Sequence, residues 1–207
     1  APRQVLNKII KLLKDNDLKA VVAPELEFYL CEKNLDPNIP LLTPVGKSGR
    51  RANGSDVFGI DSVNEFDIFL DDIYDYCEML DIGVDTLVHE SGPSQIEINL
   101  NHGDPLKLAD QTFMFKRAVR QVALKHGIHA TFMAKPHQGQ PGSSMHIHQN
   151  LVSIKDDKNI FTDLEGKETN NFYHYIGGLQ EYLPDAMVFF APYVNSYRRF
   201  VINSSAP

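Results

Sequence analysis

The chain has 207 residues, a length that suits one hydrophobic core or one large domain. Its composition is that of a globular protein, with 43% apolar and 23% charged residues and no apolar run near the ~18 residues of a membrane span. The net charge of −7 argues against a nucleic-acid-binding surface, so we expect neither a nucleic acid nor a membrane as a partner. The two cysteines lack metal or redox spacing, and we expect a cytoplasmic protein.

The first predicted element is an amphipathic helix that begins at Pro2. Residues 20–30 predict a strand in which Glu25 and Glu27 share one face, because side chains alternate along a strand. Pro24 predicts an edge position or an irregularity in that strand. Residues 31–61 are rich in proline and glycine and predict a long excursion with little regular structure.

Ser62-Val63-Asn64-Glu65 matches a capping box, which predicts the start of a helix with an apolar stripe from Phe66 to Leu80. Residues 84–89 and 95–100 predict two strands joined by the turn Ser91-Gly92-Pro93-Ser94. A long helix is then expected from Asp104 to about Gly127, and a strand over 128–133.

Residues 139–149 form a Gly/Pro/Ser-rich loop that runs into a short alternating segment. Residues 152–170 predict exposed turns, 172–182 a helix that stops at Pro184, and 185–191 a second helix that stops at Pro192. No helix or strand is predicted after that. Because strands and helices mix without regular βαβ alternation, the pattern favours an α+β fold.

In the alternating segment, Met145 and Ile147 fall on one face and His146 and His148 on the other. Two imidazoles beside flexible backbone with free N–H groups suit a metal ion and a phosphorylated ligand. A polar strand edge after a loop is the alternative.

Four carboxylates lie on or beside the predicted strands: Glu25, Glu27, Glu90 and Glu97. Polar side chains on one face of adjoining strands converge on one surface, where uncompensated carboxylates repel one another. Divalent cations would relieve this repulsion, and carboxylate oxygens with one imidazole favour Mg²⁺ or Mn²⁺ over zinc. The alternative is that these glutamates lie on solvated strand faces.

Five segments of the chain occur in an order that resembles one enzyme family. They are Pro24-Glu25-Leu26-Glu27-Phe28, His89-Glu90 with Gly92-Pro93 and residues 95–99, Ala130 to Pro136, Gly142 to Gln149, and Asn195 to Arg199. They resemble the E-x-E-F, H-E…G-P-x-Q-x-E-I-N, A-T-F-M-x-K-P, G-S-x-M-H-x-H-Q and N-S-Y-x-R segments of glutamine synthetases. The resemblance implies a mostly antiparallel sheet that carries the active site, with helices packed behind it.

The resemblance also implies an ATP-dependent ligase with two or three divalent ions, Mg²⁺ or Mn²⁺, as cofactors. Glu27, Glu90 and Glu97 would hold one ion, and Glu25 and His146 the other. His148 would contact the nucleotide phosphates. Asp85 and Asn150 fall at further nucleotide-binding positions.

For the substrates, the resemblance implies that Gly142 binds the amino-acid end of glutamate through its backbone. Arg199 would neutralise the reacting γ-carboxylate and the phosphoryl group, a role that suits a planar guanidinium. The family couples glutamate to an amine through a γ-glutamyl phosphate, and its subunits assemble as homo-oligomeric rings.

The chain departs from ammonia-using members at Ser205, where those enzymes carry a glutamate that helps to bind ammonium, so Ser205 becomes a candidate amine-binding residue. Pro141 and Asn150 also differ. The segments around Asp56, Asn64 and His102 resemble the bacterial γ-glutamylpolyamine synthetase branch. We therefore expect glutamate to be joined to putrescine or a related amine, with ammonia-dependent glutamine synthesis as the alternative.

Coverage is the second departure, because residues 1–207 resemble only part of a catalytic domain. The family's N-terminal β-rich domain and the C-terminal part of the catalytic domain have no counterpart in the chain. We therefore expect a 207-residue polypeptide by itself to be inactive. Two other hypotheses are a non-catalytic relative that keeps the fold and a plain metal- or nucleotide-binding module.

Overall fold

The computed structural model describes residues 1–52, 54 and 56–202. The chain divides into two compact units. Unit 1 comprises Ala1–Ala23, His102–Asp110 and Ile147–Val194, and unit 2 comprises Pro24–Asn101, Gln111–His146 and Asn195–Pro207. Within the described residues, no helix has the length and apolar character needed to cross a membrane.

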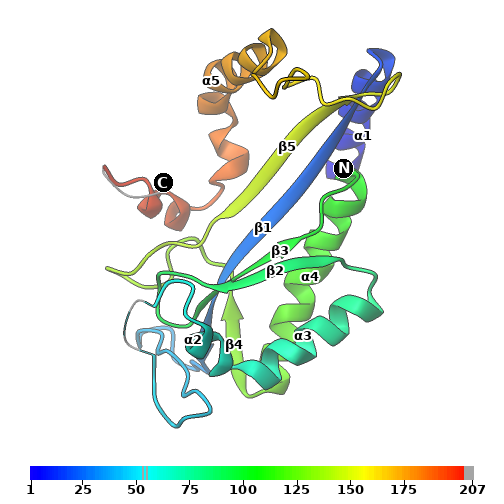
Figure 1. Ribbon diagram of the computed structural model, residues 1–207. Coiled ribbons are helices and arrows are strands. Elements are labelled where there is room, and N and C mark those ends of the chain that lie inside the picture. The colour runs from blue at the N-terminus through cyan, green and yellow to red at the C-terminus, as the bar shows by residue number, and fades with distance from the viewer. Residues whose placement is uncertain (53, 55, 203–207) are drawn as a thin grey trace. The chain divides into compact units, whose positions relative to one another are not determined.

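One sheet runs through the described part of the chain, with the order β2 (Val84–His89), β3 (Gln95–Leu100), β1 (Leu18–Glu32) and β4 (Ile128–Thr131). Neighbouring strands along this path are antiparallel, and β5 (Met145–Ser153) pairs with β1 off the path (Figure 1). The predicted α+β fold with a mostly antiparallel sheet is therefore confirmed.

Helices cover one face of the sheet in unit 2. Phe28 of β1 is fully buried, and its ring lies 5.1 Å from that of Phe132. Lys116 and Arg120 of α4 (Pro105–Lys125) lie over the same Phe132 ring, at 5.1 and 5.0 Å. Helix α4 therefore packs behind the face that carries Phe28, which leaves the odd-numbered residues of β1 on the opposite face.

Pro24 does not mark an edge strand, because β1 pairs with both β3 and β4. The alternative expectation, an irregularity, is correct. The register shifts by one residue between the pair Glu25↔Asn99 and the bridge Val22↔Gly103, on either side of Pro24. A proline is tolerated at such a shift because it has no N–H to donate to the ladder.

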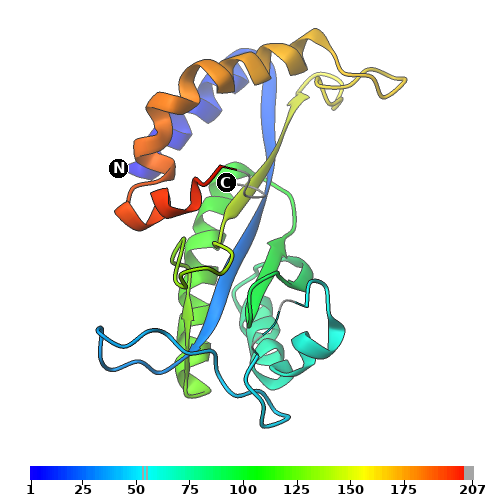
Figure 2. The ribbon, with the colours of Figure 1, turned by 90° about the vertical axis from the view of Figure 1, so that its left-hand side faces the viewer.

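The described residues between β1 and α2 (Ile60–Asn64) have little regular structure, as predicted for residues 31–61. Its described residues include an isolated bridge between Val45 and Arg51. Figure 2 shows the segment, in blue to cyan, as a long open loop.

The predicted capping box at Ser62–Glu65 is wrong. Ser62 lies inside α2, and its hydroxyl donates to Asp56 Oδ2 at 2.5 Å. Glu65 accepts from the backbone N–H of Ser48 at 3.1 Å. Both side chains therefore stabilise the preceding loop instead of a helix end. The predicted apolar stripe is confirmed for Phe66 and for Phe69, Leu70, Ile73 and Cys77 of α3 (Asp67–Met79), which are buried. The prediction is wrong at its end, because Leu80 is the C-cap and is 40% exposed.

Unit 1 contains α1 (Pro2–Asp15), as predicted, and α5 (Asn170–Phe190), which begins after the N-cap Thr169. The prediction of two helices separated at Pro184 is wrong, because α5 continues through that proline as one bent helix (Figure 2). A proline inside a helix removes one backbone hydrogen bond and bends the helix, at a cost of about 3 kcal/mol.

Two smaller predictions also need correction. Strand β4 ends at Thr131, two residues before the predicted end at Met133. Residues predicted to have no regular structure near the end of the described chain form the 3₁₀ helix η1 (Val194–Arg199).

Candidate active site

Strand alternation places glutamates together on the face of the sheet opposite α4. Glu25 and Glu27 lie two residues apart on β1, and Glu97 of β3 is the cross-strand partner of Glu27. The intervening Leu26 and Ile98 are also paired and are buried on the other face. Burial of those apolar neighbours therefore determines where the carboxylates point.

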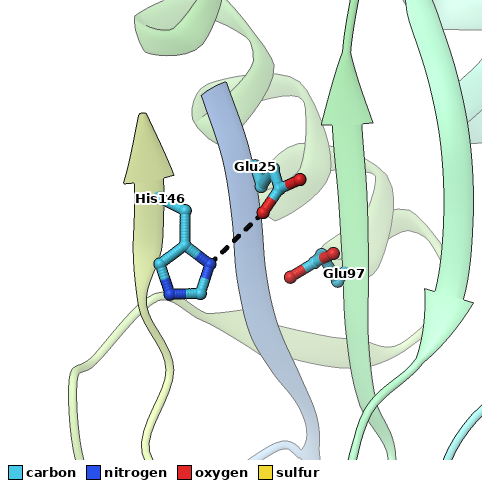
Figure 3. Close-up of side chains that lie close together, drawn as sticks. All are labelled: Glu25, Glu97 and His146. Atoms are coloured by element: carbon cyan, nitrogen blue, oxygen red, sulfur yellow. Dashed lines mark hydrogen bonds and ion pairs between the residues drawn. The ribbon is translucent and has the colours of Figure 1, made fainter. Parts of the chain in front are cut away.

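Glu25, Glu97 and His146 form a close group on this face. Each offers one ligand atom, and these atoms all lie within 4.8 Å of one another. His146 Nδ1 lies 3.3 Å from Glu25 Oε2 (Figure 3). Two carboxylates and one imidazole are a donor set that fits a hard divalent cation such as Mg²⁺ or Mn²⁺.

The pKa of Glu97 reports the repulsion on this face. Burial is the largest cause that raises it, to about 7, and the charge of Glu25 comes next. Glu90 and Glu27 raise it further. The four glutamates, which we call the carboxylate face, therefore interact electrostatically, as their predicted convergence requires.

Glu27 is the most buried of the four glutamates, and Glu90 interacts with it. Burial first, and then the charge of Glu27, raises the pKa of Glu90. Glu27 is only 9% exposed and is held by hydrogen bonds. Its Oε2 accepts from the side-chain amide of Gln95 at 3.1 Å and from the backbone N–H of Ser144 at 3.0 Å. Gln95 and Ser144 therefore both orient the carboxylate of Glu27.

Gly142 and Arg199 are in contact. A Cβ on Gly142 would lie 2.7 Å from the backbone oxygen of Ala134 and 2.8 Å from Cγ of Arg199. The stem of the arginine therefore occupies the space that a larger residue at position 142 would need. Two residues predicted to bind the same glutamate molecule are neighbours.

The loop that carries Gly142 is tied to the rest of unit 2. The carbonyl of Gly142 accepts from Gln95 Nε2 at 2.9 Å, and Tyr29 donates its hydroxyl proton to the carbonyl of Pro141 at 2.9 Å. Asn195, at the start of η1, accepts from the N–H of Lys135 at 2.7 Å and donates to its carbonyl at 2.9 Å. These bonds hold the loop and the arginine segment together.

A family model described as "Glutamine synthetase, catalytic domain" matches residues 1–207. The chain belongs to this glutamine synthetase family.

Similar members of the family carry the names of two different activities. The chain is 39% identical over 201 residues to the gamma-glutamylputrescine synthetase PuuA of Escherichia coli K12, a match covering 96% of this chain and 42% of that protein. It is 35% identical over 206 residues to the glutamine synthetase of Pyrococcus abyssi, covering 100% and 44%. The chain thus spans less than half the length of these relatives.

Solved structures of the family share the fold. A GmaS/ADP complex is 27% identical, with a TM-score of 0.80 over 99% of this chain and 45% of that one. A Plasmodium falciparum glutamine synthetase is 23% identical, with a TM-score of 0.84 over 99% and 44%. At that identity the second likeness is one of fold alone.

Other residues that the family resemblance selects lie outside this group. Asp85 is exposed on β2. His148 and Asn150 are exposed on the part of β5 that belongs to unit 1, where Asn150 Oδ1 accepts from Asn159 at 2.9 Å. Ser205 lies outside the described residues. Their proposed contacts with nucleotide or amine remain predictions.

Two residues that contact the candidate metal-binding side chains have no role in the sequence analysis. The sequence analysis assigns no role to Gln95, although its side-chain amide joins Glu27 to Gly142. Ser144 was not singled out, although it contacts both Glu27 and His146. Alternation could have indicated Ser144, which lies two residues before His146 and hence on the same face.

The pKa of Glu97 predicts how the stability of the metal-free protein depends on pH. Its value in the folded state, about 7, lies above its ordinary value of 4.5. Its contribution to stability is therefore fully present below about pH 4.5 and is lost as the pH rises through about 7. We expect the thermal midpoint of Glu97→Gln, measured without metal, to fall less than that of the wild type between pH 5 and pH 8.

The comparison of the two proteins isolates Glu97. Burial lowers the pKa of His137, so this histidine makes the folded state less stable as the pH falls below about 6.5, opposite to the effect of Glu97. Both proteins contain His137, so its effect is the same in each. Equal pH slopes for wild type and Glu97→Gln would contradict the raised pKa.

The contact at Gly142 predicts that alanine is not tolerated there. The backbone oxygen of Ala134 cannot move aside without shifting the loop. Glutamate is the substrate that the family resemblance implies for the full-length protein. Because a misplacement of about 1 Å can cost a hundredfold in rate, we expect Gly142→Ala to lower kcat/KM for glutamate by about that factor. Steady-state kinetics with glutamate as the varied substrate measures this.

The matched control is Gly177→Ala in α5, where nothing lies within 4 Å of the added Cβ in the described structure. We expect this variant to keep its activity. A Gly142→Ala enzyme with the wild-type kcat/KM would show that the glutamate site does not depend on this contact.

Proposed function

We propose that the protein of which this chain is part is an ATP-dependent ligase that joins the γ-carboxylate of glutamate to an amine, with putrescine or a related polyamine as the amine. The observation that carries the proposal is the convergence of Glu25, Glu97 and His146 within 4.8 Å in a chain of the glutamine synthetase family.

The residues divide into two groups by role. Glu27, Glu90 and Glu97 would hold one divalent ion, and Glu25 and His146 another, in the arrangement that the family resemblance implies. When bound, the ions supply positive charge that screens the carboxylate of glutamate from the phosphates of ATP. The carboxylate face by itself repels both anions, which is why these residues need the cations.

The chemistry proceeds in two displacements. An oxygen of the glutamate γ-carboxylate attacks the γ-phosphorus of ATP, and ADP leaves. The amine nitrogen then attacks the carbonyl carbon of the resulting γ-glutamyl phosphate, phosphate leaves with the electron pair, and the nitrogen loses a proton. Water must be kept out, because it would hydrolyse the acyl phosphate.

Arg199 and Gly142 position glutamate for the first displacement. The guanidinium of Arg199 donates to the γ-carboxylate and the transferred phosphoryl group, where charge accumulates. The backbone of Gly142 binds the amino-acid end. Their contact supports these two roles, because the groups that would bind the two ends of glutamate must lie close to each other. His148, Asp85 and Asn150 are the proposed nucleotide contacts.

Two observations favour a polyamine over ammonia as the second substrate. The relative with 39% identity is a gamma-glutamylputrescine synthetase, whereas the archaeal glutamine synthetases are 34–35% identical. Ser205 replaces the glutamate that ammonia-using members employ, and ammonium is a small cation that needs an acidic pocket. A diamine supplies binding energy through its own carbon chain.

Since the chain spans 42–44% of these relatives, the activity belongs in this proposal to a longer subunit. Residues 1–207 would be a partial catalytic domain, and we expect this polypeptide to be inactive by itself. The longer subunit would assemble into a homo-oligomeric ring.

The amine preference is tested with the full-length protein, glutamate, ATP and Mg²⁺ or Mn²⁺. Ammonium, methylamine, putrescine and spermidine are compared by glutamate-dependent ADP release, and products are weighed by mass spectrometry. We expect a γ-glutamylputrescine mass and weak use of ammonium.

The variant Ser205→Glu tests the reason for that preference. A carboxylate at this position should raise the use of ammonium relative to putrescine, because it stabilises a small cation. Wild-type enzyme that uses ammonium at least as well as putrescine would make the protein a glutamine synthetase. Absence of turnover with every amine would favour the non-catalytic relative.

A further inference from the structure

One serine contacts two candidate metal ligands. The backbone N–H of Ser144 donates to Glu27 Oε2 at 3.0 Å, and its hydroxyl donates to Glu27 Oε1. The same hydroxyl oxygen lies 3.3 Å from Nε2 of His146. In the proposed function, Glu27 and His146 belong to two different ions, so Ser144 links the two ion positions.

The hydroxyl of Ser144 has a single proton, which determines the direction of these bonds. The Glu27 carboxylate only accepts, so the serine proton points to Glu27. The serine oxygen can then only accept from His146, which requires the proton of the neutral imidazole to be on Nε2. Nδ1 is left with its lone pair, on the side of the ring that faces Glu25 at 3.3 Å.

Without a metal ion, a protonated imidazole would pair its Nδ1–H with Glu25. When a divalent ion is bound, the lone pair on Nδ1 and the carboxylate of Glu25 are both directed at the cation. Figure 3 shows the ring edge of His146 that carries Nδ1 turned toward Glu25, on the side of Glu97. Histidines that bind metal ions in proteins usually donate their other ring N–H to a protein group, which fixes the tautomer and the ring orientation. Ser144 is in the position of that group.

We propose that Ser144 is a positioning residue that keeps the proton of His146 on Nε2 and directs Nδ1 toward the divalent ion, while it orients the carboxylate of Glu27. This inference rests on the metal site of the proposed function.

The position of Ser144 is itself fixed by β1. Its carbonyl accepts from the backbone N–H of Glu27 at 3.2 Å, so one glutamate holds the serine through both main-chain groups. Glu27 is 9% exposed, and water cannot readily replace a lost hydroxyl there. Removal of the hydroxyl therefore leaves Glu27 with one donor fewer and the Nε2–H of His146 without this acceptor.

The first experiment measures Mn²⁺ affinity of the full-length protein by isothermal titration calorimetry. Loss of a group that orients a metal ligand typically costs about tenfold to a hundredfold in affinity, which we expect for Ser144→Ala. Ser144→Thr keeps the hydroxyl and should stay close to the wild type. The matched control is Ser62→Ala, which also removes a serine-to-carboxylate hydrogen bond, to Asp56, and should leave Mn²⁺ affinity unchanged.

The second experiment records electron spin echo modulation of bound Mn²⁺, which detects a directly coordinated imidazole nitrogen. The wild type should show this nitrogen signal, and its loss in His146→Gln assigns it. Ser144→Ala should weaken the signal at full Mn²⁺ occupancy, and Ser144→Thr should restore it. A general loss of folding would not remove the nitrogen signal while Mn²⁺ stays bound.

The outcomes separate this inference from the proposed function. If the wild type binds no Mn²⁺, the metal site fails and the inference fails with it. If the wild type binds Mn²⁺ and Ser144→Ala matches it in affinity and nitrogen signal, the metal site stands and the positioning role of Ser144 is overturned.

Discussion

Electrostatic repulsion among Glu25, Glu27, Glu90 and Glu97 is the main constraint on this structure. Glu25, Glu27 and Glu97 share one face of an antiparallel sheet, and Glu90 follows the end of β2 close enough to affect them. The pKa of Glu97 rises to about 7 because the side chain is buried and because the other three charges repel it. Such an arrangement costs folding free energy unless protons or cations neutralise it. A fold that keeps it trades stability for function, and the imidazole of His146 adds the nitrogen donor that suits a divalent ion.

The rest of unit 2 holds these charges in place. Helix α4 and the buried residues Phe28 and Ile98 take up the opposite face of the sheet, so the glutamates cannot turn inward. On the polar side, Gln95 bonds both to Glu27 and to the carbonyl of Gly142. A single buried amide thus connects the carboxylate face to the loop that carries the proposed glutamate contact, and Arg199 packs directly against that loop.

Strand alternation made most of this site predictable from the sequence. Residues 95–100 alternate cleanly, and Glu25 and Glu27 are two residues apart, so their shared face follows from the period of a strand. The predictions failed where a local rule competed with tertiary contacts. Ser62 and Glu65 have the spacing of a capping box, but both bond to the preceding loop, and α5 continues through Pro184. Alternation could have placed Ser144 on the face of His146, but its contact with Glu27 depends on how two segments far apart in the sequence pair.

We propose that the carboxylate face binds divalent ions. The most direct measurement is the crystal structure of the full-length protein grown with Mn²⁺, ADP and glutamate, with anomalous diffraction collected at the manganese edge. The account predicts an anomalous peak between Glu25, Glu97 and His146. An ordered site with nucleotide and glutamate bound and no manganese beside these three residues would contradict it.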